Sequence, residues 1–241
     1  MEEKAIKTGE RIAKFMARAG ICSRRAAEAM ILEGRVQVNG EKLISPAKNV
    51  LPGDDIVVDG KKLGEPEATR LWLYHKPVGL VTSHKDEKGR DNVFEHLPAE
   101  LPRVVSVGRL DLNSEGLLLL TNDGELARRL AHPSTGWIRR YRVRVHGTPK
   151  IEDLKKLEKG ITIEGVLFRA ESVMVERQQG SNCWLAISLR EGKNREIRRM
   201  FEHFGLPVSR LIRVAFGGFQ LGNLPKGEVK EVPRRVLKEQ L

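Results

Sequence analysis

The sequence predicts an α+β protein in which a small helix–helix–hairpin domain precedes a larger domain with a mixed, mostly antiparallel sheet. Apolar residues recur at helical spacing near the start of the chain, and the pair Asn39-Gly40 marks a tight hairpin turn. From Leu71 onward, short apolar runs predominate. Most connections between these runs are too short for helical crossovers, which favours antiparallel pairing.

The first domain is expected to span residues 1–60. Its first helix stops at Gly20, and Ser23 is a suitable N-cap for a second helix that ends at Gly34. Residues 36–38 then alternate in hydrophobicity up to the hairpin turn, and a further apolar strand follows. The pattern predicts two helices packed on a small hairpin.

The second domain is expected to span residues 71–241, after a polar, glycine-containing linker at residues 61–70. Candidate strands lie at residues 71–75, 78–82, 104–107, 117–121, 140–146, 161–163, 172–177, 183–190, 208–214 and 229–232. Candidate helices lie at residues 124–131, 150–158 and 194–204.

The charge balance predicts a polyanionic partner. The formal net charge is +11, of which the first 70 residues supply only +2. Nucleic acid is favoured over a membrane, because no apolar run approaches the roughly 20 residues of a spanning helix. The first ten residues lack a signal-peptide core, and Cys22 and Cys183 are the only cysteines. We therefore expect a monomer in a reducing, cytoplasmic setting, without a membrane partner.

The segment Gly108–Gly124 contains the main candidate for chemistry. It places Asp111 in a polar loop between two apolar runs that are expected to be strands. A carboxylate on such a loop suits a nucleophile or a base. The local sequence alone also leaves open a turn-capping role for Asp111.

The segment Arg139–Val145 is predicted to be a strand with two different faces. One face carries Tyr141, Val143 and Val145, and the other carries Arg140, Arg142 and Arg144. An aromatic residue and a row of arginines on one strand suit nucleic acid, through stacking and phosphate contacts.

The segment Arg190–Met200 is predicted to be a strand end, a turn and the start of a helix. It contains Lys193, Arg195, Ile197 and Arg198. Basic residues early in a helix oppose its dipole, which indicates a carboxylate or a phosphate nearby.

Several arginines of the first domain are candidates for RNA binding. Arg18, Arg24 and Arg25 gather where the two predicted helices meet, and Arg35 precedes the hairpin. Paired arginines at a helix N-terminus suit a phosphate better than a fold-stabilising role. About 50 residues here resemble the alpha-L RNA-binding domain first described in ribosomal small-subunit protein four. The resemblance implies that these arginines bind the RNA backbone. The alternative is that they belong to an ordinary solvent-exposed helix face.

The Asp111, Tyr141 and Arg198 segments occur in the order of the three recurring motifs of the RNA pseudouridine synthases. The whole chain resembles the ribosomal RNA family that contains the small-subunit enzyme A and the large-subunit enzymes B, E and F. The tail Ser209–Val214 is most similar to the enzyme B branch. This resemblance implies an N-terminal alpha-L domain, a pseudouridine synthase catalytic domain and ribosomal RNA, most simply large-subunit RNA, as substrate.

The resemblance also implies a role for each site residue. Asp111 corresponds to the catalytic aspartate, and Arg109 to the residue that enters the RNA stack when the uridine flips out. Tyr141 corresponds to the tyrosine that stacks on the base, Ile197 to an aliphatic residue beside it, and Arg198 to the basic partner of the aspartate. Arg140, Lys193 and Arg195 are expected to contact RNA.

The implied reaction needs no cofactor and no metal. It involves no redox change, and the sequence contains neither GxGxxG nor a P-loop. The six histidines show no paired-ligand spacing. Three alternatives remain open: the same reaction on small-subunit RNA, a non-catalytic RNA-binding or assembly factor, and an RNA hydrolase that uses Asp111.

Overall fold

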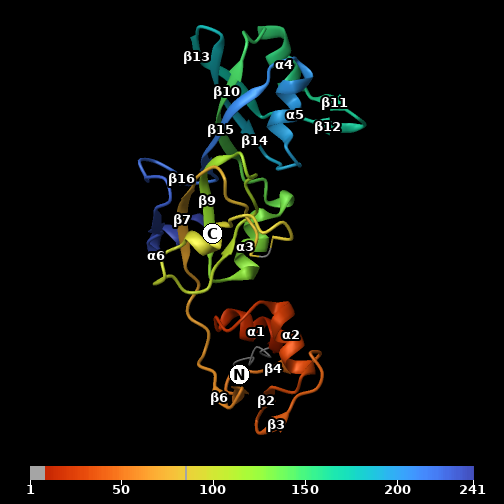
Figure 1. Cartoon of the computed structure of the whole chain (residues 1–241), viewed down its shortest axis with the longest axis vertical. Coiled ribbons are helices and arrows are strands. Elements are labelled where there is room, and N and C mark those ends of the chain that lie inside the picture. Colours follow the sequence, from red (N-terminus) through yellow and green to blue (C-terminus); the bar gives the residue numbers. More distant parts are fainter. Residues whose placement is uncertain (1–8, 85) are drawn as a thin grey trace, which may run out of the picture. The chain divides into compact units, whose positions relative to one another are not determined.

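A computed structural model describes residues 9–84 and 86–241 of the chain (Figure 1). The chain forms two compact units, Met1–Thr69 and Arg70–Leu241. Each unit has its own hydrophobic core, with one cluster of buried residues in the first unit and two in the second.

The first unit packs two helices on short strands. The elements are β1 Glu10–Arg11, α1 Ile12–Arg18, α2 Arg24–Leu32, β2 Val36–Val38, β3 Glu41–Lys42, β4 Asn49–Val50, β5 Ile56–Val58 and β6 Lys61–Lys62. Ser23 caps α2 as predicted, because its hydroxyl accepts a hydrogen bond from the amide of Ala26 at 3.1 Å. The Asn39-Gly40 turn also forms as predicted, with positive φ angles of 54° and 82°. Strand β6 pairs with β5 inside the stretch that was expected to be a linker.

The second unit is built on a nine-stranded sheet. Its main path runs in the order β13, β14, β10, β15, β9, β7 and β17, while β16 pairs with β15 and β8 pairs with β9. The strands are β7 Leu71–Lys76, β8 Val105–Ser106, β9 Glu115–Thr121, β10 Arg139–His146, β13 Ser172–Gln179, β14 Asn182–Leu189, β15 Val208–Phe216, β16 Phe219–Gln220 and β17 Val229–Glu231. A separate hairpin is formed by β11 Ile161–Ile163 and β12 Val166–Phe168.

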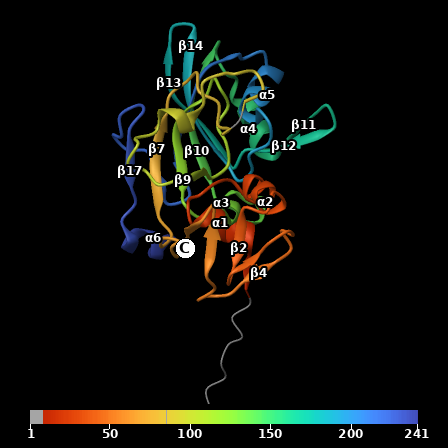
Figure 2. The ribbon, with the colours of Figure 1, turned by 60° about the horizontal axis from the view of Figure 1, so that its bottom comes forward.

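The pairing in this sheet is antiparallel except between β15 and β9, which confirms the predicted mixed, mostly antiparallel architecture. Figure 2 shows β17, β7 and β9 side by side at one end of the sheet. The parallel pair has a functional consequence. It places β9, which follows the Asp111 loop, next to β15, and β15 lies next to the Tyr141 strand β10.

Helices complete the second unit. They are α3 Gly124–Ala131, α4 Ile151–Lys159, α5 Glu196–His203 and α6 Arg234–Gln240, with short 3-10 turns η1 Val93–His96 and η2 Pro133–Thr135. Helix α3 has the predicted bounds. Helix α5 begins at Glu196 rather than at residue 194, because Arg195 takes a left-handed conformation with φ 48°.

One predicted strand is wrong. Residues 78–82 form an isolated bridge, Val81 with Asn92, instead of a strand. The chain turns at Gly79, whose φ is 91°, and Thr82 bonds the Asp111 loop rather than a neighbouring strand. Strands β12 and β16 and helix α6 are absent from the sequence-based expectations.

Candidate active site

The loop Leu110–Ser114 is held in place through its backbone carbonyl groups. The Leu110 carbonyl accepts from the Thr82 hydroxyl at 2.9 Å, and the Leu112 carbonyl accepts from the Gly79 amide at 2.9 Å. The Asp111 and Ser114 carbonyls accept from Lys76, and the Asn113 carbonyl accepts from Arg198. All five carbonyls of the loop therefore have donors, and the Asp111 backbone is fixed from several sides.

Lys76, at the end of β7, is the central donor to this loop. Its side chain is fully buried, and its ammonium donates to the carbonyls of Pro77 at 2.9 Å, Asp111 at 3.2 Å and Ser114 at 2.9 Å. These three acceptors match the three hydrogens of an ammonium group. Burial lowers the pKa of Lys76 to about 8, against the opposing effect of the Asp111 and Glu115 charges.

Sequence reasoning missed Lys76 and Thr82. Lys76 did leave a signal in the sequence. It follows Trp72 and Tyr74 at every second position of a strand, and this pattern places it on their buried face. A lysine on such a face needs several oxygen partners, which the Asp111 loop provides.

Arg198 reaches the loop but binds its backbone. The guanidinium donates to the Asn113 carbonyl at 2.8 Å and to the Val208 carbonyl at 3.0 Å, and the residue is 8% exposed. Among the described residues, no ion pair within 4.0 Å joins Arg198 to the Asp111 carboxylate, in contrast to the direct partnership that the resemblance implies. Burial lowers the pKa of Arg198, and the nearby Asp111 charge partly opposes this shift.

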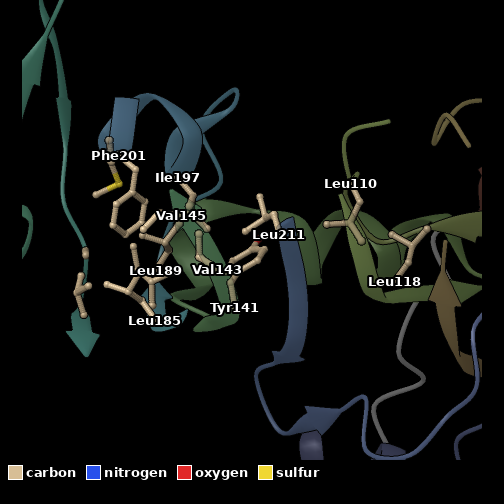
Figure 3. Close-up of a cluster of buried hydrophobic side chains, with 14 of the residues drawn as sticks. Leu110, Leu118, Tyr141, Val143, Val145, Leu185, Leu189, Ile197, Phe201 and Leu211 are labelled. Carbon is tan, nitrogen blue, oxygen red and sulfur yellow. The ribbon is translucent and has the colours of Figure 1, made fainter. Parts of the chain in front are cut away.

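Tyr141 and Ile197 belong to one buried cluster, together with Leu110 from the start of the Asp111 loop. Figure 3 shows Tyr141 on β10 in this cluster with Val143, while Ile197 belongs to helix α5. Arg198 of the same helix bonds the Asp111 loop, so the start of α5 lies against that loop. The aromatic ring of Tyr141 and the aliphatic side chain of Ile197 provide an apolar setting suited to a flat base.

Glu115, the first residue of β9, anchors the far end of the loop. It is 2% exposed and forms ion pairs with Arg210 of β15 and with Lys226, the latter at 2.6 Å. Burial alone would raise the pKa of Glu115, but these two cations hold it below its usual range. These two ion pairs hold the start of β9, where the loop ends.

The remaining predicted site residues of the second unit differ in their surroundings. Arg109 and Arg140 are exposed and have no partner among the residues that the structure describes. Lys193 donates to the Leu167 carbonyl at 2.8 Å and pairs with Glu191. Arg195 lies 3.8 Å from Glu202, a partly exposed pair of low expected strength.

The predicted RNA-binding arginines of the first unit fall into two groups. Arg24 and Arg25 are exposed in the first turn of α2 and unpaired within residues 9–84 and 86–241. Arg18 pairs with Glu10 at 2.7 Å, and Arg35 binds both oxygens of Asp59 at 2.8 and 2.7 Å. Arg24 and Arg25 are therefore available to a phosphate, whereas Arg18 and Arg35 are already bound within the unit.

Neither a membrane-spanning helix nor a cluster of metal ligands occurs in the described part of the chain. None of its helices combines the length and the apolar character needed to cross a bilayer. It also holds no group of three or more His, Cys, Asp or Glu residues that could bind a metal ion.

Activity is expected to fall as the pH rises through about 8, because neutral Lys76 has only two hydrogens for three carbonyls. Global unfolding does not explain such a loss. The unfolded chain holds this proton more tightly, so the Lys76 contribution to the free energy of unfolding rises between about pH 8 and 10.5. A pH profile of kcat/KM checks this, with a Lys76→Met variant as the control. A descending limb that persists unchanged in this variant would contradict the assignment.

Comparison with known protein families assigns both units. The model of the family described as RNA pseudouridylate synthase matches residues 70–203, and the S4 domain model matches residues 10–56. The S4 match confirms the predicted alpha-L domain. Both matches lie where the structure has its two compact units.

Individual relatives agree with this assignment. An uncharacterized RNA pseudouridine synthase of Rickettsia felis is 50% identical over 230 residues, which cover 95% of this chain and 100% of that protein. Ribosomal large subunit pseudouridine synthase B of Yersinia pestis is 42% identical over 225 residues, with 91% and 70% coverage. A crystal structure described as pseudouridylate synthase matches with a TM-score of 0.66 at 25% identity and covers 96% of this chain. The chain therefore belongs to the RNA pseudouridylate synthase family, with an S4 domain at its N-terminal end.

Proposed function

We propose that this protein converts a specific uridine of large-subunit ribosomal RNA to pseudouridine, with Asp111 as the catalytic group. The fixed Leu110–Ser114 loop supports the proposal, because it holds the Asp111 backbone in place and is bound by Arg198 at the start of helix α5, next to Ile197. The relative named for the ribosomal large subunit supports the choice of RNA. We expect the protein to act as a monomer in the cytoplasm.

Arg109 and Tyr141 are proposed to expose the target base. A uridine inside a stem or stack must leave it before its sugar carbon can be reached, at a cost of a few kcal/mol. Arg109 is exposed and unpaired within the described chain, so it is available to fill the vacated position. Tyr141 then offers a ring face to the flipped base.

Asp111 is proposed to act on the ribose of the flipped nucleotide. Its carboxylate either attacks C1′ or removes a proton from C2′ to form a glycal; both routes need the ionised form. The N1–C1′ bond breaks, the base rotates, and C5 bonds to C1′. C5 then loses its proton and N1 gains one, so the reaction requires no oxidant or reductant. The positive charges of Lys76 and Arg198 lie near the Asp111 carboxylate and interact with it electrostatically.

Ile197 is proposed to retain the detached base. It is 4% exposed and lies with Tyr141 in the buried cluster. An apolar wall at this point excludes water that would otherwise intercept the activated sugar and leave an abasic site. The base then remains in place long enough to rotate.

The surface cations are proposed to hold the RNA backbone. Arg24 and Arg25 offer unpaired guanidinium groups on the S4 unit, and Arg140 does so on the catalytic unit. Lys193 and Arg195 lie just before the start of helix α5. Contacts of this kind position RNA without reading its sequence.

The decisive test maps pseudouridines by carbodiimide primer extension on ribosomal RNA from cells that lack the gene. One stop lost from large-subunit RNA, and restored by the wild-type gene but not by Asp111→Asn, would support the proposal. A stop lost from small-subunit RNA would retain the reaction and refute the substrate. An unchanged map would favour an assembly factor.

A further inference from the structure

The sheet of the catalytic unit has a second face rich in arginine. Along β10, burial alternates, so that Tyr141, Val143 and Val145 lie in the core. Because neighbouring side chains of a strand point to opposite faces, Arg142 and Arg144 lie on the other side of the sheet. We use the term outer arginine face for the surface formed by Arg142, Arg144, Arg177, Trp184 and Arg210.

Strand register assembles this face from four strands that lie side by side in Figure 1. Trp184 of β14 pairs with Arg177 of β13 on one side and with Arg144 of β10 on the other. Arg144 in turn pairs with Arg210 of β15. The four residues form one row across the sheet, with the indole between two arginines.

The Trp184 ring organises the guanidinium groups. Arg142 lies 5.1 Å from the ring centroid, and Arg144 and Arg210 each lie 5.8 Å from it. Cation–π attraction holds arginines in such positions and leaves their N–H edges available to other acceptors. These three arginines are therefore ordered before any ligand binds.

Carboxylates offset only part of this charge. Glu176 binds Arg142 at 2.8 Å, and buried Glu115 pairs with Arg210. Arg144 donates to the neutral hydroxyl of Ser209 at 2.9 Å. Within the described chain, Arg177 has no partner at all. Two of the four guanidinium groups thus remain without a counter-charge.

An exposed apolar side chain lies at the rim of this face. Met174 of β13 is 65% exposed. Met174 pairs across the sheet with Ala186, which pairs with Arg142. Arginines beside an exposed apolar side chain match the chemistry of RNA, which presents phosphates next to sugars and bases.

We propose that the outer arginine face binds the sugar–phosphate backbone of the substrate RNA, on the side of the sheet opposite to Tyr141. The proposal rests on the proposed function in one respect, because it takes ribosomal RNA as the ligand. This contact is additional to the catalytic pocket and to the S4 unit. Through this contact the catalytic unit binds RNA at a position away from the nucleotide that reacts.

The test compares two double variants that lose the same charge. Arg144→Gln/Arg177→Gln alters the outer arginine face, whereas Arg128→Gln/Arg129→Gln alters exposed positions on α3. Filter binding measures Kd for unmodified large-subunit and small-subunit rRNA transcripts over a series of KCl concentrations. The first variant is expected to bind about tenfold more weakly and to reduce the salt slope by about 1.5 relative to the second. Equal Kd values and slopes for the two variants would overturn the proposal.

A crosslinking experiment identifies the occupant directly. A benzophenone amino acid at position 174 replaces an exposed methionine, so it leaves the core unchanged. Irradiation with the transcript is expected to attach RNA to the protein. A crosslink only to a second protein chain, or none to RNA, would overturn the proposal. The proposed function is tested by a different result, because contacts to the RNA backbone do not depend on the target uridine. It fails if the wild-type protein forms no pseudouridine in either transcript.

Discussion

Replacing Asp111 with asparagine is expected to lower the rate of pseudouridine formation by at least about four orders of magnitude, with little change in RNA affinity. The amide can neither attack C1′ nor accept a proton. The loop itself is expected to keep its position, because its hydrogen bonds are made by backbone carbonyls. No donor among the described residues bonds the Asp111 carboxylate. Single-turnover release of tritium from 5-tritiated uridine in the RNA measures the rate, and filter binding measures Kd.

Asp91→Asn provides the matched control, because it makes the same chemical change at a carboxylate whose side chain is 75% exposed. This control is expected to retain activity. Substantial turnover by the Asp111 variant, or an equal loss in both variants, would refute the assignment of Asp111 as the catalytic group.

Lys76→Met is expected to lower the free energy of unfolding by about 2 kcal/mol and to reduce kcat at least about tenfold. The variant removes the Lys76 bond from three carbonyls; the Asp111 carbonyl keeps its bond from the Ser114 amide at 3.0 Å, while the buried bond to the Ser114 carbonyl is lost. Methionine removes the cost of burying an ammonium, which offsets part of the loss. Urea unfolding gives the stability and single-turnover assays give the rate.

The exposed lysine Lys155 on α4 offers the control, as Lys155→Met is expected to leave stability and rate unchanged. A purely structural role for Lys76 predicts lower stability with an unaltered pH profile. A positioning role predicts, in addition, that the decline in activity near pH 8 disappears in the variant. An unchanged profile would therefore limit Lys76 to a structural role.

Local sequence patterns were sufficient for much of the fold. Helix α3 was predicted with its bounds because its apolar residues repeat at helical spacing and Asp123 precedes them as an N-cap. The hairpin at Asn39-Gly40 formed because these residues accept positive φ angles. Strand β16, with two residues, was too short to give a pattern. Residues 78–82 looked like a strand, but their partner is a loop.

In the candidate site, sequence motifs indicated only the side chains that are proposed to act on the RNA, and not the residues that hold them in place. Asp111, Tyr141 and Ile197 come from three motifs. Strand β15 pairs with β9, which follows the Asp111 loop, and with β10, which carries Tyr141, while Ile197 lies on helix α5. Lys76 and Thr82 act on backbone carbonyls about 30 residues further along the chain. A carbonyl acceptor does not constrain the residue that carries it, so such contacts leave little trace in the sequence.

Because the loop is held through its backbone carbonyls, its position depends little on its side chains. Leu112 and Asn113 contribute their backbone oxygens to its geometry, while Asn113 is exposed and Leu112 is half-buried. Their side chains are thus open to mutation at small cost to the position of the Asp111 carboxylate, the proposed catalytic group. In an engineering library, they are positions at which side chains can be varied while the backbone geometry of the loop is kept.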